Sequence, residues 1–235
     1  MNKSFFLLAL LFTASIILSS CRQTATIAVT TPDSARATCS MHVVPNPGIG
    51  DPTATTDPGV VINGIRWATR NVDTPGTFAA APESAGRLFQ WGTLNGVTHH
   101  FDNTTSGAVS GWYDNATSHY RVAWTPANNP CPQGWRVPTQ QELQSLNRVG
   151  SVWMTYNGVR GRLYGTAPNA IFLPAAGFRV SGSGDLFGVG TDGYYWSSQQ
   201  VSYTHAILLW FYSEQSLGFG LWVRADALSV RCVQE

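Results

Sequence analysis

Short apolar runs, separated by glycine and small polar residues, characterise the chain from residue 59 onward. The first two runs, Val60-Val61-Ile62 and Ile65-Arg66-Trp67, flank the dipeptide Asn63-Gly64. Asn-Gly favours the positive φ angles that both central residues of a type I′ turn must adopt. We therefore predict that the folded part of the chain opens with a β-hairpin.

Further apolar and aromatic runs follow Gly150, with Gly, Ser, Asn and Asp between them. Runs of this kind, bounded by turn-forming residues, are typical of β-strands. The predicted strands cover residues 170–173, 194–197, 205–212, 220–223 and 228–233.

One helix is predicted after Thr139. The sequence Thr139-Gln140-Gln141-Glu142 fits a capping box, Leu143 and Leu146 share a face, and Gly150 supplies a stop. Residues 86–91 are a candidate for a second, shorter helix. One capped helix, a hairpin and several late strands together predict an α+β domain with an antiparallel sheet and long loops.

The first residues have the pattern of a secretory signal. A positive start at Lys3 precedes an apolar run from Phe5 to Leu18, which is shorter than the roughly 20 residues of a membrane-spanning helix. Leu18-Ser19-Ser20-Cys21 resembles the lipobox of bacterial lipoproteins, in which the chain is cleaved before the cysteine and the cysteine is acylated. An ordinary signal peptide with an incidental cysteine is the alternative.

This pattern predicts three regions. Residues 1–20 are the lipoprotein signal peptide, residues 21–58 are a lipidated Cys21 with a flexible tether rich in Thr, Pro and Asp, and residues 59–235 are the folded domain. We expect a lipoprotein of the outer membrane, whose partner is membrane lipid through the acylated Cys21. The sequence does not distinguish the periplasmic face from the cell surface.

Charge and composition narrow the class of protein. Fourteen basic and thirteen acidic residues give a net charge of +1, and only 11% of the residues are charged, against about 25% in an average domain. This balance excludes a broad electrostatic nucleic-acid binder. The 12% of aromatic residues argue against disorder.

Four cysteines are present, and Cys21 is assigned to lipid. In an exported protein a pair of the remaining three is expected to oxidise. Because Cys39 lies in the tether, we predict a disulfide between Cys131 and Cys232. Cys39 would stay free or pair between molecules.

Five sequence blocks stand out in the folded part. In chain order they are Trp67-Ala68-Thr69-Arg70-Asn71-Val72, Cys131 to Thr139 (Cys-Pro-Gln-Gly-Trp-Arg-Val-Pro-Thr), Phe172 to Arg179 (Phe-Leu-Pro-Ala-Ala-Gly-Phe-Arg), Gly193 to Ser198 (Gly-Tyr-Tyr-Trp-Ser-Ser) and Ser229-Val230-Arg231-Cys232-Val233. Together they resemble the blocks of the Fibrobacter succinogenes major paralogous domain family, which occurs in exported proteins of Bacteroidetes. This resemblance implies a C-type lectin-like fold, in which the first and last strands lie together and a disulfide joins the helix region to the last strand.

Metal and cofactor motifs are weak. The Glu-Pro-Asn, Gln-Pro-Asp and Trp-Asn-Asp motifs of calcium-dependent C-type lectins do not occur. Asp185 and Asp192 are the candidate calcium ligands, with a role in turns as the alternative. Residues 188–193 spell G-x-G-x-x-G, but a predicted strand follows where a dinucleotide site needs a helix. No cofactor is therefore expected. A zinc site at His99, His100 and the polar residues after them fits no established spacing.

The surplus of aromatic residues is the remaining signal. All nine Trp and eight Tyr lie after residue 59, and most of them must fill the core. Trp210, Tyr212, Trp222 and Arg224 are the candidate ligand-binding residues, because they lie near the end of the predicted sheet. Packing in the core is the alternative.

No acid, base and nucleophile converge in the sequence, so we expect a protein that is not an enzyme. The first functional hypothesis is an envelope binding module that recognises a glycan or a protein through lectin-like loops. The alternative is a fimbria-associated or structural envelope subunit.

Overall fold

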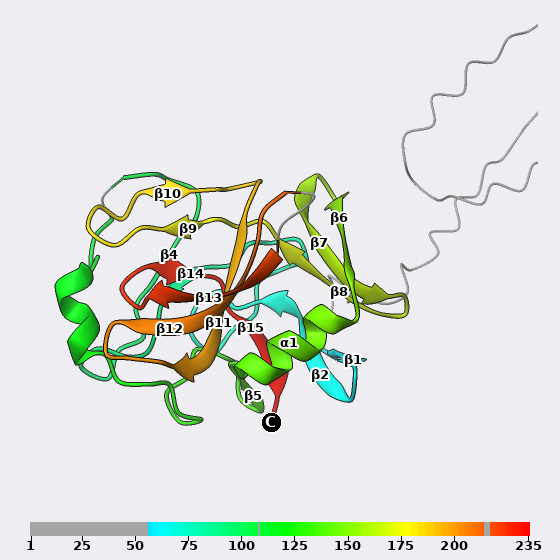
Figure 1. The fold of residues 1–235 in the computed structure, drawn as a ribbon, viewed down its shortest axis with the longest axis horizontal. Coiled ribbons are helices and arrows are strands. Elements are labelled where there is room, and N and C mark those ends of the chain that lie inside the picture. Colours follow the sequence, from blue (N-terminus) through cyan, green and yellow to red (C-terminus); the bar gives the residue numbers. More distant parts are fainter. Residues whose placement is uncertain (1–55, 108, 214–216) are drawn as a thin grey trace, which may run out of the picture. The chain divides into compact units, whose positions relative to one another are not determined.

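Antiparallel strand pairs dominate the computed structural model (Figure 1), which describes residues 56–107, 109–213 and 217–235. The predicted signal peptide, Cys21, Cys39 and all but the last three residues of the predicted tether lie outside the described residues. The described residues belong to one compact unit. Within them, no helix is long and apolar enough to cross a membrane.

The described strands form four sheets. One has the order β1 (Val60–Ile62), β2 (Ile65–Asn71), β15 (Arg231–Gln234), β5 (Trp135–Arg136). The largest has the order β10 (Leu186–Phe187), β9 (Phe178–Arg179), β14 (Ala227–Leu228), β3 (Leu88–Gln90), β4 (His100–Phe101). The other two are β6 (Ser151–Tyr156), β7 (Val159–Thr166), β8 (Asn169–Pro174) and β11 (Gly193–Gln200), β12 (His205–Phe211), β13 (Leu217–Val223).

The prediction of an α+β, C-type lectin-like domain is wrong. The structure is β-rich, with 45% strand and 7% helix, and its described residues contain a single α-helix, α1 (Gln140–Arg148), and the 3₁₀ helix η1 (Asn115–Tyr120). The segment 86–91, a candidate helix, contains strand β3 instead. Gly86 there has φ +67°, and Arg87 N donates to Val72 O at 3.0 Å, so the backbone leads into a sheet.

The two local signals with the clearest chemistry are confirmed. The hairpin of β1 and β2 turns through Asn63 (φ 50°) and Gly64 (φ 78°), as a type I′ turn requires. Helix α1 begins with the predicted capping box: Thr139 Oγ1 accepts from Glu142 N at 3.2 Å, and Thr139 N donates to Glu142 Oε2 at 2.7 Å. It packs near β7, β11 and β12 and buries Leu143 and Leu146.

The two ends of the described chain meet in one sheet. Strand β15 lies between β2 and β5, and the predicted disulfide between Cys131 and Cys232 is present, with an S–S distance of 2.06 Å. Asp57 fixes the start of the described chain, because its buried carboxylate accepts from Thr69 N at 3.0 Å and Arg70 N at 3.1 Å.

The sheet β11-β12-β13 separates two parts of the core. Successive side chains of a strand point to opposite faces, so one face of this sheet contributes to one apolar cluster and the other face to another. The first cluster includes Tyr194, Trp196 and Leu208, and the second includes Tyr195, Leu209 and Phe211. This arrangement positions the aromatic residues described next.

Candidate ligand-binding surface

The indole ring of Trp210 lies over strand β13 at two positions that are occupied by glycine, Gly218 and Gly220. Across the sheet, Tyr194 on β11 pairs with Trp210 on β12, and Trp210 pairs with Gly218 on β13. A Cβ atom added at Gly218 would lie 2.9 Å from Trp210 Cζ2, and one at Gly220 would lie 3.6 Å from Trp210 Nε1. The missing side chains thus leave room for the indole ring, which is half-buried.

Six aromatic side chains form a continuous series of ring contacts at the surface end of this face. The ring centroids of Trp210 and Tyr212 are 4.8 Å apart, those of Tyr212 and Tyr194 are 6.1 Å apart, and those of Tyr194 and Trp222 are 5.3 Å apart. Phe178 continues the series, at 5.5 Å from Trp222 and 5.9 Å from Phe187. We call these residues the aromatic ridge: Phe178, Phe187, Tyr194, Trp210, Tyr212 and Trp222.

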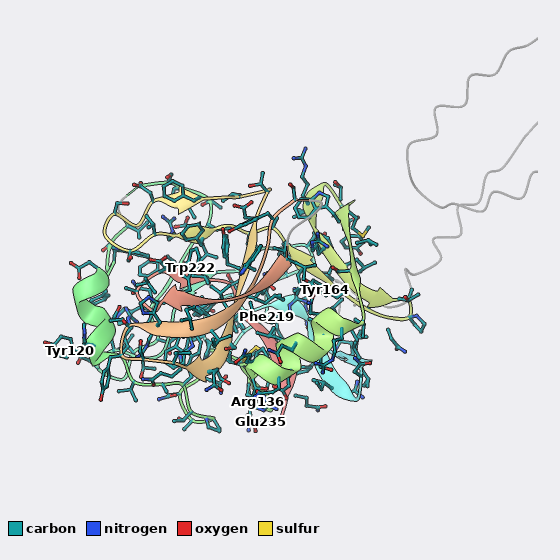
Figure 2. The ribbon with its side chains drawn as sticks, viewed as in Figure 1. Tyr120, Arg136, Tyr164, Phe219, Trp222 and Glu235 are labelled. Atoms are coloured by element: carbon teal, nitrogen blue, oxygen red, sulfur yellow. A yellow bond between two sulfur atoms is a disulfide. The ribbon has the colours of Figure 1, made fainter. Side chains whose placement is uncertain are left out.

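The ridge is partly open to solvent. Tyr212 is 39% exposed and Phe187 is 51% exposed, whereas Tyr194 is buried. Trp222 lies on the face of β13 opposite to that of Phe219 (Figure 2), because Trp222 pairs with Ala206 and Phe219 with Leu209.

Polar groups accompany the rings. Burial, a hydrogen bond with Tyr212 and the nearby Asp192 carboxylate raise the pKa of the Tyr194 hydroxyl well above its ordinary value. The Tyr194 hydroxyl therefore stays protonated at neutral pH. Aromatic faces next to hydroxyl and carboxylate groups match a ligand that has both C–H faces and hydroxyl groups.

Of the residues predicted to bind a ligand, Trp210, Tyr212 and Trp222 come together, and Arg224 does not join them at the surface. Arg224 is fully buried, and its guanidinium lies 4.4 Å from the centroid of the Trp91 ring. The main chain explains this position, because Trp91 N donates to Arg224 O at 3.0 Å and Arg224 N donates to Thr204 O at 2.8 Å. These bonds turn Arg224 toward the interior.

Asp185 has a turn contact. Ser183 Oγ donates to Asp185 Oδ2 at 2.6 Å, and Asp192 lies against Gly188, where an added Cβ would be 2.4 Å from Asp192 Oδ2. The described residues contain no group of three or more His, Cys, Asp or Glu side chains that could hold a metal ion. The geometry at Asp185 and Asp192 thus gives no support to a calcium site.

The candidate zinc residues, His99, His100 and the polar residues after them, make other contacts. His99 packs on Tyr113 with ring centroids 4.2 Å apart, and burial, followed by the charge of Arg121, lowers the pKa of His99. Asp102 Oδ1 accepts from the backbone of Thr104 at 2.9 Å. These residues shape a loop.

An open groove of about 560 Å³ lies elsewhere, between residues 83–85 and the ends of β7 and β8. Its ionisable side chains are Glu83 and Arg160, and Glu83 Oε1 accepts from Asn157 Nδ2 at 3.0 Å. Among its described lining residues there is no histidine, cysteine or second carboxylate, so they form no acid, base and nucleophile group.

Sequence reasoning missed three members of the ridge: Phe178, Phe187 and Tyr194. Two of them lie in the sequence blocks that resemble the family. The pairing of Tyr194 with Trp210 depends on strand register, which no local motif indicates.

Comparison of the chain with protein-family models, curated proteins and solved structures gave no match. The resemblance to the Fibrobacter succinogenes major paralogous domain family therefore stays a prediction from sequence blocks.

Proposed function

We propose that this protein is a non-enzymatic, lipid-anchored binding module of the cell envelope and that the aromatic ridge recognises its ligand, a glycan or a protein. The single observation that carries the proposal is the pair of neighbouring rings of Trp210, which lies over the glycines of β13, and Tyr212, which is 39% exposed. The ligand surface is thus formed by strands rather than by the lectin-like loops expected from the sequence.

A glycan is the ligand class that the ridge favours. Tyr and Trp combine a rigid apolar face with a polar group, and a sugar ring presents C–H groups on its faces and hydroxyls at its edge. The hydroxyl of the partly exposed Tyr212 can accept or donate a hydrogen bond at that edge. A rigid pair of rings also loses little conformational entropy on binding.

The anchor is proposed from the sequence. Acylation of Cys21 would hold the module at the outer membrane, since each buried methylene contributes about 0.8 kcal/mol. Recognition would then take place at that membrane.

A glycan array tests the ligand class with residues 22–235 produced without lipid. We expect binding by the wild-type chain and its loss in Trp210→Ala and Tyr212→Ala. Tyr203→Ala is the matched control, because Tyr203 is 72% exposed and lies outside the ridge. Equal binding by Trp210→Ala and Tyr203→Ala would show that the ridge is not the site.

A second candidate function is that of a fimbria-associated or structural envelope subunit, and the edge of β13 favours it. Strand β13 ends its sheet, pairs only with β12 among the described strands, and contains neither lysine nor proline. Such an edge can pair with another chain. If it does, light scattering will show oligomers for the wild-type chain, and Leu221→Lys, at an exposed position of β13, will convert them to monomers.

A further inference from the structure

Two buried arginines, Arg121 and Arg224, lie next to each other. Arg224 Nη2 donates to Arg121 O, and Arg121 Nη2 donates to Gln90 Oε1. Arg121 is only 4% exposed and Arg224 is fully buried. The two side chains thus bring two positive charges into the interior.

These charges have no acidic counterpart among the described residues. Neither arginine forms an ion pair there, and their described acceptors are uncharged oxygens, those of Gln90, Arg121, Ser202 and Tyr203. Gln90 cannot reorient, because its Nε2 donates to Tyr113 O and to Ala225 O, each at 2.5 Å. A buried charge without a counter-charge is strongly unfavourable.

Burial lowers the pKa of both groups, and for Arg121 the charge of Arg224 adds to this effect, so that each pKa is about 10. Both guanidinium groups therefore remain protonated at neutral pH. The net positive charge of the pair has to be balanced by something other than the described acceptors.

Several buried hydrogen-bond donors of this pair and of its neighbours have no partner within the described residues. Arg121 Nε and Nη1 and Arg224 Nε have no hydrogen-bond partner within the described residues, and neither do Trp124 Nε1 and the buried Ser118 Oγ. Ser118 is adjacent, because Arg121 N donates to Ser118 O at 3.3 Å. Trp124 packs on Trp91, the ring that Arg224 covers, at 5.5 Å. Buried polar groups are nearly always paired, so such a group of free donors indicates a missing acceptor.

We propose that Arg121 and Arg224 bind a small oxyanion, a carboxylate, phosphate or sulfate group. Guanidinium groups present N–H pairs that match the oxygens of such anions, and these charge-assisted bonds are the strongest that arginine makes. The anion would accept from the free Nε and Nη1 atoms and neutralise the pair. Tyr203, whose carbonyl oxygen accepts from Arg224 Nη1 at 3.2 Å, is 72% exposed, so solvent lies close to the pair. The site uses no residue of the ridge and stands independently of the proposed function.

Titration calorimetry of residues 22–235 tests this site with sodium phosphate, sodium sulfate and sodium acetate, at an ionic strength held constant with sodium chloride. We expect saturable one-to-one binding of at least one oxyanion, weakened at least about tenfold in Arg121→Gln. The control Arg148→Gln removes an exposed arginine of α1 and should bind like the wild type. Binding of acetate alone identifies a carboxylate site, and binding of phosphate and sulfate identifies a site for tetrahedral anions.

Absence of saturable binding for all three anions, or equal affinity in Arg121→Gln and Arg148→Gln, would overturn the proposal. If Arg121→Gln does not fold, crystals of the wild-type chain grown with selenate give a second measurement. An anomalous peak within hydrogen-bond distance of Arg121 Nη1 or Arg224 Nε supports the site. Ordered water alone at these atoms contradicts it.

Discussion

Single arginines join segments that are far apart in the sequence. Arg231 is almost completely buried, and it donates to Asn71 Oδ1 at 2.7 Å, to Ala68 O at 3.1 Å and to Phe172 O at 3.0 Å. These acceptors lie on β2 and β8, while Arg231 begins β15. One planar side chain thus satisfies oxygen atoms from two other strands through three separate nitrogen atoms, whereas the N–H groups of a lysine all sit on one nitrogen.

We therefore expect Arg231→Lys to lower the free energy of unfolding by about 2–4 kcal/mol, because buried acceptors lose their donors. Urea unfolding measures the change. Arg148→Lys, at an exposed position, should change it by less than about 0.5 kcal/mol. Similar values for the two variants would mean that the Arg231 bonds contribute little.

The ionised carboxylate of Asp102 stabilises one loop, so this stabilisation depends on pH in the acid range. The backbone N–H of Thr104, together with that of Thr105 and the hydroxyls of both, holds the pKa of Asp102 well below its ordinary value, although partial burial opposes this. Arg179 Nη2 lies 3.2 Å from the same carboxylate. A carboxyl group with a lowered pKa stabilises the folded state above its unfolded pKa of about 3.9, and this contribution is lost as the pH falls through the folded pKa.

Asp102→Asn should accordingly lower the melting temperature at pH 7, and the difference from the wild type should shrink below about pH 4. Thermal unfolding between pH 7 and pH 2 measures both. A difference that stays constant over this range would show that the ionised carboxylate is not what stabilises the loop.

At the scale of elements, the segments predicted correctly are those whose signal lies within a few residues. Asn63-Gly64 specifies its turn, and Thr139 with Glu142 specifies the start of α1. Strand β3 could not be predicted in this way. Its residues Leu88–Gln90 are all buried, so they show no periodicity, and the strand is defined by its pairing with β14 and β4.

The residues of the candidate site also divide into those indicated by the local sequence and those whose positions depend on distant segments. The aromatic surplus indicated Trp210, Tyr212 and Trp222, whereas their neighbour Tyr194 depends on cross-strand register. Arg224 was a candidate because it lies near the end of the predicted sheet, with packing in the core as the alternative. Its burial depends on backbone bonds to Trp91 and Thr204, which come from distant segments.

The glycines of β13 provide a test of the ridge that leaves its aromatic residues unchanged. Gly218→Ala would place a Cβ 2.9 Å from Trp210 Cζ2, so the indole must shift, whereas Gly220→Ala would make an ordinary contact at 3.6 Å. We expect Gly218→Ala to weaken ligand binding by about tenfold and Gly220→Ala to leave it nearly unchanged. Binding to the glycan found on the array measures both, and equal affinities would argue against a role for the indole position.

At the scale of the whole molecule, the disulfide between Cys131 and Cys232 connects the segment before α1 to the last strand. The two cysteines are separated by 101 positions in the sequence. Strand β15 already pairs with β2 and with β5, which follows Cys131. The packing of this sheet therefore does not depend on the covalent bond alone, and the main effect of the bond falls on the unfolded chain.

Replacement of both cysteines by alanine should thus preserve the fold and lower its stability. In the chain-entropy account a loop of about 100 residues contributes up to about 4.7 kcal/mol, and loss of a native disulfide typically costs about 2–5 kcal/mol. Urea unfolding measures the loss, and an unchanged near-ultraviolet circular dichroism spectrum checks the packing. Dithiothreitol should bring the wild-type chain to the level of the double variant and leave the variant unaffected. A loss below about 1 kcal/mol would show that the unfolded chain is restricted by something other than this bond.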